Sequence, residues 1–342
     1  MATARHKDFT VPTDWVRDLI QIADPGPGVL ARALAAADLH WTDLSADGRS
    51  IGQRQEVRFV LSLHDSLGGG HASAELGLRM PGRTSTVVSY LEHSSRTLGE
   101  ALAALARYLR LTRPGARLGF AVAEGRGVLS LDHLDPWTWH SAPYQEFVVS
   151  TALASFRTST GQPVSPLAVG LSRASEGREP RLEEIWGAPV STGEDRARMT
   201  FGAEALALPL VGYDAPLLAH LKRYGDLLLR SAPEPHATLR HQVEAAILDR
   251  LPRGAPPVAD VASDLGLSVR TLTRRLAEDS LTYRGLVEDV RRQKAERMLA
   301  DPRLSLAEIA FLLGYAEQSS FTNAFRRWTG TAPGAYRSAQ GL

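Results

Sequence analysis

An internal repeat in the last hundred residues limits the fold of this part of the chain more than any other sequence feature. Four apolar positions recur 48 residues further along: Val258, Val261, Ala262 and Leu265 match Leu306, Ile309, Ala310 and Leu313. The spacing i, i+3, i+4, i+7 places each set on one face of a short helix. Each stretch is followed by a glycine, Gly266 or Gly314, which can adopt the left-handed conformation that ends a helix.

A second helix is expected after each glycine. In the first copy Ser268 is a suitable N-cap, and Leu272 and Leu276 lie on one face of the helix that follows. In the second copy the turn between the two helices is one residue longer. The apolar stripe of the second helix there consists of Phe321, Phe325 and Trp328. A helix, a tight turn and a second helix form the helix-turn-helix pattern, whose second helix enters the major groove of DNA.

Both second helices carry side chains suited to base edges on the opposite face. These are Arg270, Thr273 and Arg274 in the first copy and Gln318, Ser319, Thr322 and Asn323 in the second. Arginine pairs bidentately with guanine, glutamine and asparagine suit adenine, and threonine bonds to several bases or contacts the thymine methyl. Solvated helix faces would look the same residue by residue, but repetition of the whole pattern favours DNA recognition. Arg275, Arg326 and Arg327 are candidates for phosphate contacts.

Between the copies, residues Tyr283–Ala300 have a helical pattern. At 1.5 Å per residue this helix would be about 27 Å long, and one turn of DNA is about 34 Å. One chain could therefore place two recognition helices in successive major grooves.

A proline-containing segment, Arg230–Ala237, is the predicted linker between two domains, with the boundary near Pro235. The formal net charge of +1 conceals an asymmetry: from Ala237 onward there are 15 Lys and Arg against 12 Asp and Glu. The excess is modest, so charge alone does not establish DNA binding. We expect residues 1–235 to form one domain and residues 236–342 a second, all-helical one.

Residues 1–235 have the mixed pattern of an α+β domain with a mostly antiparallel sheet. Strands are predicted as a hairpin, Arg117–Glu124 and Val128–Leu134, and at Leu167–Ser172 and Arg196–Phe201. Thr97 and Glu100 fit a capping box ahead of Leu98, Leu102, Leu105 and Leu109. Further helices are expected at Trp15–Ala23, Gly28–Asp38, Gln53–Leu67, Tyr144–Thr158 and Arg181–Trp186.

Several function classes lack their motifs. The chain has no cysteine, which excludes disulfides and thiol chemistry. There is no nucleophile elbow, phosphate loop or zincin motif, so no catalytic residue, cofactor or metal is predicted. His133 and His140 have no matching carboxylate or thiolate to complete a metal site. The sequence shows neither a secretory signal nor a membrane span, so a cytoplasmic protein is expected.

Two tryptophans, Trp137 and Trp139, stand out within Asp135–His140. A tryptophan pair can form the wall of an apolar ligand pocket. Packing in the core or at an interface accounts for such a pair equally well. Both interpretations stay open, and the pair is our candidate effector contact.

The carboxy-terminal hundred residues resemble the AraC/XylS family of bacterial regulators. The resemblance rests on Leu265–Leu272, Arg291 with Ala295 and Leu299, Leu304–Ala310, Leu313–Tyr315, Ser320 with Phe321, Phe325–Trp328, Gly330 and Pro333–Arg337. It implies that the seven candidate base-contacting residues named above face the bases. Ser280 stands where this branch commonly has glycine, and Asn323 where arginine is common.

Most of residues 15–230 resemble the arabinose-binding-type effector domain of one AraC branch, through Ala74–Leu78, Thr97–Leu102, Arg107–Tyr108 and Ile185–Val190. The resemblance implies a transcription regulator controlled by a small-molecule effector of unknown identity, a homodimer, and contact with RNA polymerase. Two alternatives remain: a constitutive DNA-binding regulator with no effector, and an enzyme domain fused to a DNA-binding module. The alkyl-transfer repair enzymes that carry such modules need a cysteine, which this chain lacks.

Overall fold

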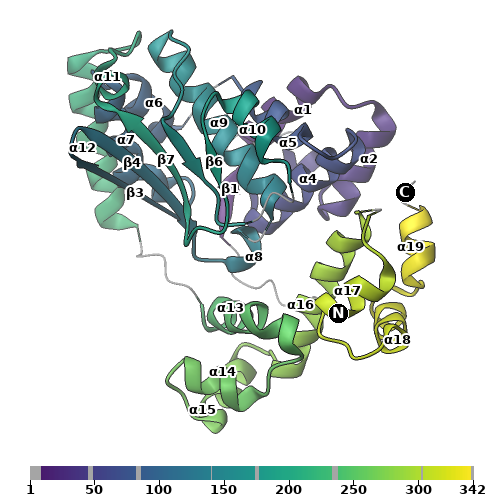
Figure 1. Ribbon diagram of the computed structural model, residues 1–342. Helices are drawn as coiled ribbons and strands as arrows, with labels where there is room; N and C mark the ends of the chain where they lie inside the picture. The colour runs from purple at the N-terminus through teal and green to yellow at the C-terminus, as the bar shows by residue number, and fades with distance from the viewer. Residues whose placement is uncertain are drawn as a thin grey trace. The chain divides into compact units, whose positions relative to one another are not determined.

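The computed structural model describes residues 9–44, 49–81, 86–139, 141–173, 177–232, 238–301 and 303–339. They fall into two compact units, residues 9–232 and residues 238–339 (Figure 1), each of which is described by itself. Part of the predicted linker, residues 233–237, lies outside the described residues.

Among the described residues, the first unit combines twelve α-helices with two sheets. The helices are α1 (Asp14–Ala23), α2 (Pro27–Ala36), α3 (Trp41–Leu44), α4 (Gln53–Ser66), α5 (Ala72–Leu78), α6 (Val87–His93), α7 (Leu98–Tyr108), α8 (Pro136–Trp139), α9 (Ala142–Thr160), α10 (Glu179–Trp186), α11 (Ala203–Ala207) and α12 (Ala215–Ser231). A short 3-10 helix, Leu109–Leu111, extends α7. Strands β1 (Thr10–Pro12) and β2 (Ser50–Gly52) form a small antiparallel pair.

The main sheet has the strand order β3-β4-β7-β5-β6. Its strands are β3 (Ala116–Ala123), β4 (Arg126–His133), β5 (Ala168–Gly170), β6 (Val190–Ser191) and β7 (Ala197–Gly202). The expectation of a mostly antiparallel sheet needs correction, because the sheet is mixed: β5 and β6 pair in parallel. Helix α10 carries the chain back between these two strands, which makes them run in the same direction. Strand β6 has only two residues, too few for an alternating pattern.

One face of the sheet packs against helices, as its alternating residues dictate. Leu129 is opposite Met199, and Gly127 is opposite Phe201. Leu129, Met199 and Phe201 lie in a buried cluster with side chains of α7, α9 and α10. The opposite face carries mainly polar and small residues, including Arg117, Ser130 and Arg198. The predicted Thr97 cap on α7 is confirmed, whereas Glu100 forms an ion pair with Arg96.

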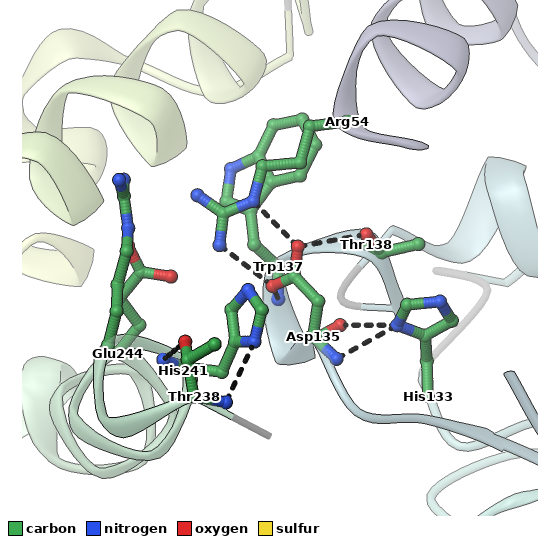
Figure 2. A network of polar contacts seen from close by, with 9 residues as sticks. Arg54, His133, Asp135, Trp137, Thr138, Thr238, His241 and Glu244 are labelled. Carbon is green, nitrogen blue, oxygen red and sulfur yellow. Dashed lines mark hydrogen bonds and ion pairs between the residues drawn. The ribbon is translucent and has the colours of Figure 1, made fainter. Parts of the chain in front are cut away.

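A buried ion pair connects α4 to the segment before α8 (Figure 2). Arg54 Nε and Nη2 donate to the two carboxylate oxygens of Asp135 at 2.6 and 2.8 Å, and Asp135 is fully buried. The same carboxylate accepts from the Trp137 backbone N–H and the Thr138 hydroxyl, and the Asp135 backbone N–H donates to His133 Nδ1. Buried charges of this kind need such partners, because desolvation is costly.

The second unit is all-helical and has one core. It consists of α13 (Leu239–Arg250), a 3-10 helix (Leu251–Arg253), α14 (Val258–Asp264), α15 (Val269–Glu278), α16 (Tyr283–Leu299), α17 (Leu306–Leu312), α18 (Gln318–Thr329) and α19 (Pro333–Ala339). Helix α13 begins with a capping box of Thr238 and His241 (Figure 2). A single apolar cluster takes side chains from α13 through α18, so both copies of the repeat share it.

The local signals of the repeat are confirmed. Ser268 caps α15, and Ser305 with Glu308 forms the capping box of α17. Gly266 and Gly314 have positive φ angles of 63° and 72°. Ser280 also has a positive φ, of 58°, which is the physical reason for a glycine preference at this position.

Replacing the two turn glycines, Gly266 and Gly314, by alanine should lower the free energy of unfolding by unequal amounts. A Cβ at Gly266 would contact nothing within 4 Å, whereas one at Gly314 would lie 2.5 Å from the Leu251 carbonyl oxygen. Gly266→Ala should cost about 1–2 kcal/mol of backbone strain. Gly314→Ala should cost about 1–3 kcal/mol more, because it also overpacks the turn. Urea denaturation of the purified carboxy-terminal unit measures both, and equal losses would contradict the asymmetry.

Candidate functional site

Helix α15 presents the first predicted recognition face. Leu272 and Leu276 are fully buried beneath it, and the Ser268 hydroxyl oxygen accepts from the Thr271 backbone N–H at 3.1 Å. The four candidate contacts on its outer side are all exposed: Arg270, Thr273, Arg274 and Arg275. The buried leucines fix which side of the helix faces outward, so the sequence placed these side chains on the accessible side.

The arginines of this face differ in their partners. Arg274 pairs with Glu278 at 2.7 Å, one turn along the helix, and both side chains are more than half exposed. Exposed pairs of this kind contribute about 0–1 kcal/mol and open easily. Within the described part of the chain, Arg270 and Arg275 have no ion-pair partner. Their guanidinium groups are accordingly available to an anionic ligand.

Helix α18 presents the second face. Phe321 and Phe325 are fully buried, and Trp328 is partly buried. Gln318, Ser319 and Asn323 are exposed, and Thr322 is partly so. Local bonds hold two of these side chains: the Thr322 hydroxyl donates to the Gln318 carbonyl at 3.0 Å, and the Ser319 hydroxyl donates to Glu317 at 3.1 Å.

Two arginines follow on the same helix. Arg326 and Arg327 are both exposed, and Arg327 pairs with Glu288 of α16 at 3.0 Å. Asn323 and Arg327 also line a cleft of about 580 Å³ beside α16, together with Arg284, Arg291 and Tyr315. Glu288 lines the same cleft and pairs with Arg284 and Arg327, so the three guanidinium groups leave a net positive charge there, which suits a phosphate backbone.

Helix α16 connects the two copies. Its 17 residues correspond to about 26 Å at 1.5 Å per residue. Arg291 on this helix donates to the carbonyls of Leu313 and Gly314 at 2.9 and 3.0 Å, and its guanidinium lies 4.2 Å from the Tyr315 ring centroid. These contacts hold the turn between α17 and α18 against the connecting helix.

The first unit contains a cavity of about 260 Å³. Its apolar lining comes from several elements and includes Leu105, Leu118, Leu129, Phe147, Phe156 and Met199. Such a lining, with a few convergent polar groups, is typical of small-molecule sites.

The polar groups at this cavity include an ion pair whose carboxylate is buried and whose guanidinium is partly exposed. Arg113 Nη1 donates to both oxygens of Glu56 at 2.8 and 3.1 Å, and the Tyr144 hydroxyl donates to Glu56 at 3.4 Å. Burial and the adjacent Glu56 carboxylate raise the pKa of Tyr144, so its hydroxyl stays protonated. Burial opposes the charge on Arg113, but Glu56 and Tyr144 outweigh it, so the Arg113 pKa lies above its usual value.

Another carboxyl lines the cavity. Glu92 of α6 is buried and accepts hydrogen bonds from the hydroxyls of Ser155 and Ser159 at 2.6 and 3.3 Å. Burial raises its pKa from 4.5 to about 7, although the two serine bonds act in the opposite direction. Near neutral pH, this group is therefore partly protonated.

The structure separates the two candidate tryptophans. Trp139 lines the cavity, and its ring lies 6.3 Å from that of Tyr144. Trp137 is not among the residues that line it. The guanidinium groups of Arg54 and Arg58 lie 5.4 Å from the Trp137 ring, which packs in the core. His133 also lines the cavity, whereas His140 lies outside the described residues.

Sequence reasoning missed the other polar residues of the cavity, among them Trp15, Gln53, Glu56, Glu92, Arg113 and Tyr144. Gln53 and Glu56 are three residues apart at the start of a predicted helix, which places them on one face. Nothing local connects this face to Arg113, which lies 57 positions beyond Glu56.

Two family models match the chain. The arabinose-binding domain of AraC transcription regulators, amino-terminal part, matches residues 29–210. A helix-turn-helix domain matches residues 261–339, which include α15, α16, α17 and α18. No described helix has the length and apolar character needed to cross a membrane.

Similar proteins are described as regulators. The chain is 27% identical over 264 residues to the ornithine utilization regulator of Pseudomonas aeruginosa, covering 77% of each chain. It is 29% identical over 258 residues to the HTH-type transcriptional regulator VirS of Mycobacterium tuberculosis, covering 75% of each. A solved structure, the transcriptional regulator CdpR of Pseudomonas aeruginosa, is 25% identical with a TM-score of 0.44, covering 91% of this chain and 97% of that one.

The raised pKa of Glu92 predicts a pH-dependent stability. The folded protein binds this proton more tightly than the unfolded chain, so the stabilisation is complete below about pH 4.5 and is lost as the pH rises to about 7. Glu92→Gln removes the ionisation, so above pH 7 it should be more stable than the parent by on the order of 3 kcal/mol. Urea denaturation at pH 5 and pH 8 measures the difference.

A matched control for this prediction is Glu204→Gln, since Glu204 is exposed on α11. It should change stability little at either pH. A Glu92→Gln variant that is destabilised equally at both pH values would contradict the assignment of a buried, proton-binding carboxyl.

Proposed function

The chain belongs to the AraC family of transcription regulators, and on that premise we propose that residues 236–342 bind DNA while residues 1–235 bind a small molecule that controls the binding. The observation that carries this proposal is the pair of exposed polar helix faces, on α15 and α18, built on one shared core. A cavity with a largely apolar lining in the other unit supplies a place for the effector.

The proposed DNA contacts divide into two kinds. Arg270, Thr273 and Arg274 on α15 contact bases in one major groove, and Gln318, Ser319, Thr322 and Asn323 on α18 contact bases in the next. Arg275, Arg326 and Arg327 contact phosphates, which add affinity and register but little sequence preference. The length of α16 supports this placement, because its 17 residues span most of one DNA turn.

Two alternatives are less well supported. A constitutive regulator would not need a cavity lined by two buried carboxyl groups, Glu56 and Glu92. An enzyme fused to a DNA-binding module would need reactive groups there, whereas the Glu56 carboxylate is engaged by Arg113. The relatives named above are regulators. We therefore propose that the protein has no catalytic role and acts in the cytoplasm, where it recruits or blocks RNA polymerase at DNA.

A homodimer is also proposed, through helix α12. One side of this helix packs with Leu218 against α6 and α7. Leu217, Tyr224 and Leu227 are exposed by 42%, 54% and 54%. Their spacing of seven and then three residues is that of a coiled-coil seam. A second copy of α12 is the partner that fits such a stripe.

DNA binding tests the proposal directly. The full chain and a fragment of residues 237–342 should both select the same motif from random-sequence duplex DNA. Affinity should fall steeply between 50 and 200 mM salt, because phosphate contacts release counterions. A folded fragment that shows no salt-dependent DNA binding would contradict the assignment of DNA binding to this unit.

Substitutions separate base contacts from phosphate contacts. Arg270→Ala should lose about 1–3 kcal/mol on the selected motif and relax the preference at one base position. Arg326→Ala, the matched change on α18, should weaken all sequences alike, and Arg327→Ala should do the same. Motif selection repeated with each variant decides between the two kinds. Uniform losses for all three variants would show that the recognition face is misassigned.

The dimer is tested on the full chain by light scattering at tens of micromolar. Leu227→Glu places a charge in the apolar stripe and should shift the protein toward monomer. Leu167→Glu is the matched control, because Leu167 is exposed by 51% elsewhere in the same unit. A monomeric parent, or equal behaviour of the two variants, would contradict the α12 interface.

A further inference from the structure

We propose that the cavity of the first unit binds an uncharged molecule whose apolar body ends in one hydrogen-bonding head group that both donates and accepts, such as a carboxamide or alcohol. This inference rests on the proposed function, in which the cavity holds the effector. It adds the chemical class of that effector and the residues that recognise its head group.

The size and walls of the cavity define the body of the ligand. A cavity of about 150 Å³ holds benzene, so the 260 Å³ found here suits a molecule of about ten to twelve non-hydrogen atoms by proportion. The apolar part of the walls consists mostly of leucine, methionine, valine and phenylalanine side chains. They favour an alkyl or aromatic body over a sugar or an amino acid, whose polar groups would be left without partners.

Three polar atoms at the cavity have no hydrogen-bond partner among the described residues. They are the indole nitrogens of Trp15 and Trp139 and the side-chain oxygen of Gln53. All three side chains are at least 94% buried and line the cavity. An indole N–H can only donate, and the Gln53 oxygen can only accept. Burying such groups unpaired is costly, so they call for a ligand that brings both an acceptor and a donor.

A chain of contacts places these atoms in one region of the cavity. The Arg113 guanidinium lies 5.0 Å from the Trp15 ring and bonds to Glu56. Glu56 accepts from Tyr144, whose ring packs edge-on against Trp139. Gln53 lies one helical turn before Glu56 on α4, and its side chain is hydrogen-bonded to Tyr144. Trp15, Gln53 and Trp139 therefore all border the group formed by Arg113, Glu56 and Tyr144, which is where the head group is placed in this proposal.

The charge balance of this region disfavours a charged head group. Arg113 and Glu56 neutralise each other through two hydrogen bonds. An anion would compete with Glu56 for Arg113, and a cation would be repelled by Arg113. Glu92 also lines the cavity, but its raised pKa keeps it partly protonated, so it carries less than a full negative charge near neutral pH.

Asp14 and Asp18 also line the cavity, but both are partly exposed, and Asp14 pairs with Arg17. Solvent screens these two carboxylates, so they add little attraction for a cation. Arg198, another lining residue, pairs with Glu194.

Four probes with one body test the head group on the full chain. They are 4-phenylbutanamide, 4-phenylbutanoate, 4-phenylbutylammonium and butylbenzene, each titrated by calorimetry and by thermal melting. The amide should bind at least tenfold more tightly than either charged probe and should raise the melting temperature. Tighter binding of the carboxylate or the ammonium, or no binding of any probe at millimolar concentration, would overturn the proposal.

Trp139→Phe tests the recognition residue, because it keeps an aromatic ring and removes the N–H. The variant should bind the amide about five- to tenfold more weakly and butylbenzene as well as the parent does. Trp328→Phe is the matched control, since Trp328 belongs to the carboxy-terminal unit. Unchanged amide affinity in Trp139→Phe would show that the indole N–H does not contact the head group.

DNA affinity, measured in parallel on the selected motif, distinguishes this proposal from the proposed function. Amide binding that alters DNA affinity supports both. Amide binding without any effect on DNA affinity would support the chemistry of the cavity and contradict its role as the effector site.

Discussion

The buried pair of Arg54 and Asp135 fixes the arrangement on which the candidate ligand site depends. Arg54 lies between Gln53 and Glu56 on α4, and Asp135 lies four residues before Trp139. Both carboxylate oxygens are engaged at 2.6 and 2.8 Å in a fully buried position. Removing one partner of such a pair costs about 3–5 kcal/mol, because the other is left as an uncompensated buried charge. The pair therefore holds α4 and α8 in the one register that brings Glu56, Gln53 and Trp139 to the same cavity.

The helical unit could be predicted from the sequence in detail because its signals are local. The cap of Ser268, the capping box of Ser305 with Glu308 and the turn at Gly314 are each specified within a few residues. The buried stripes then fix which side of α15 and α18 faces outward. Ser280, which stands where this branch commonly has glycine, also lies at a constrained backbone position, because it adopts the left-handed conformation that glycine tolerates best.

The effector unit was predictable in its elements but not in its site. The hairpin of β3 and β4 and the helices α4, α7 and α9 follow from period and turn signals. The cavity does not, because its polar residues are drawn from α1, α4, α6, α8, α9 and the loop after α7, among other segments, and no short pattern connects them. Trp137 and Trp139 show why the site could not be predicted from local sequence. They are two residues apart, yet Trp137 packs against arginine side chains and Trp139 lines the cavity. A one-turn helix, α8, turns their side chains in different directions.

The single core shared by the two helix pairs has a consequence for the DNA. Because α16 contributes to the packing of both copies, the recognition helices cannot change their separation without opening that core. When the protein binds DNA as proposed, α15 and α18 each contact one short segment of base pairs, here called a half-site. The spacing between the two half-sites is therefore set by the protein core. Inserting one base pair between the half-sites would rotate one of them by about 34–36° around the DNA axis relative to the other. Promoters of this regulator should accordingly tolerate base changes within a half-site better than any change in the number of base pairs between the two.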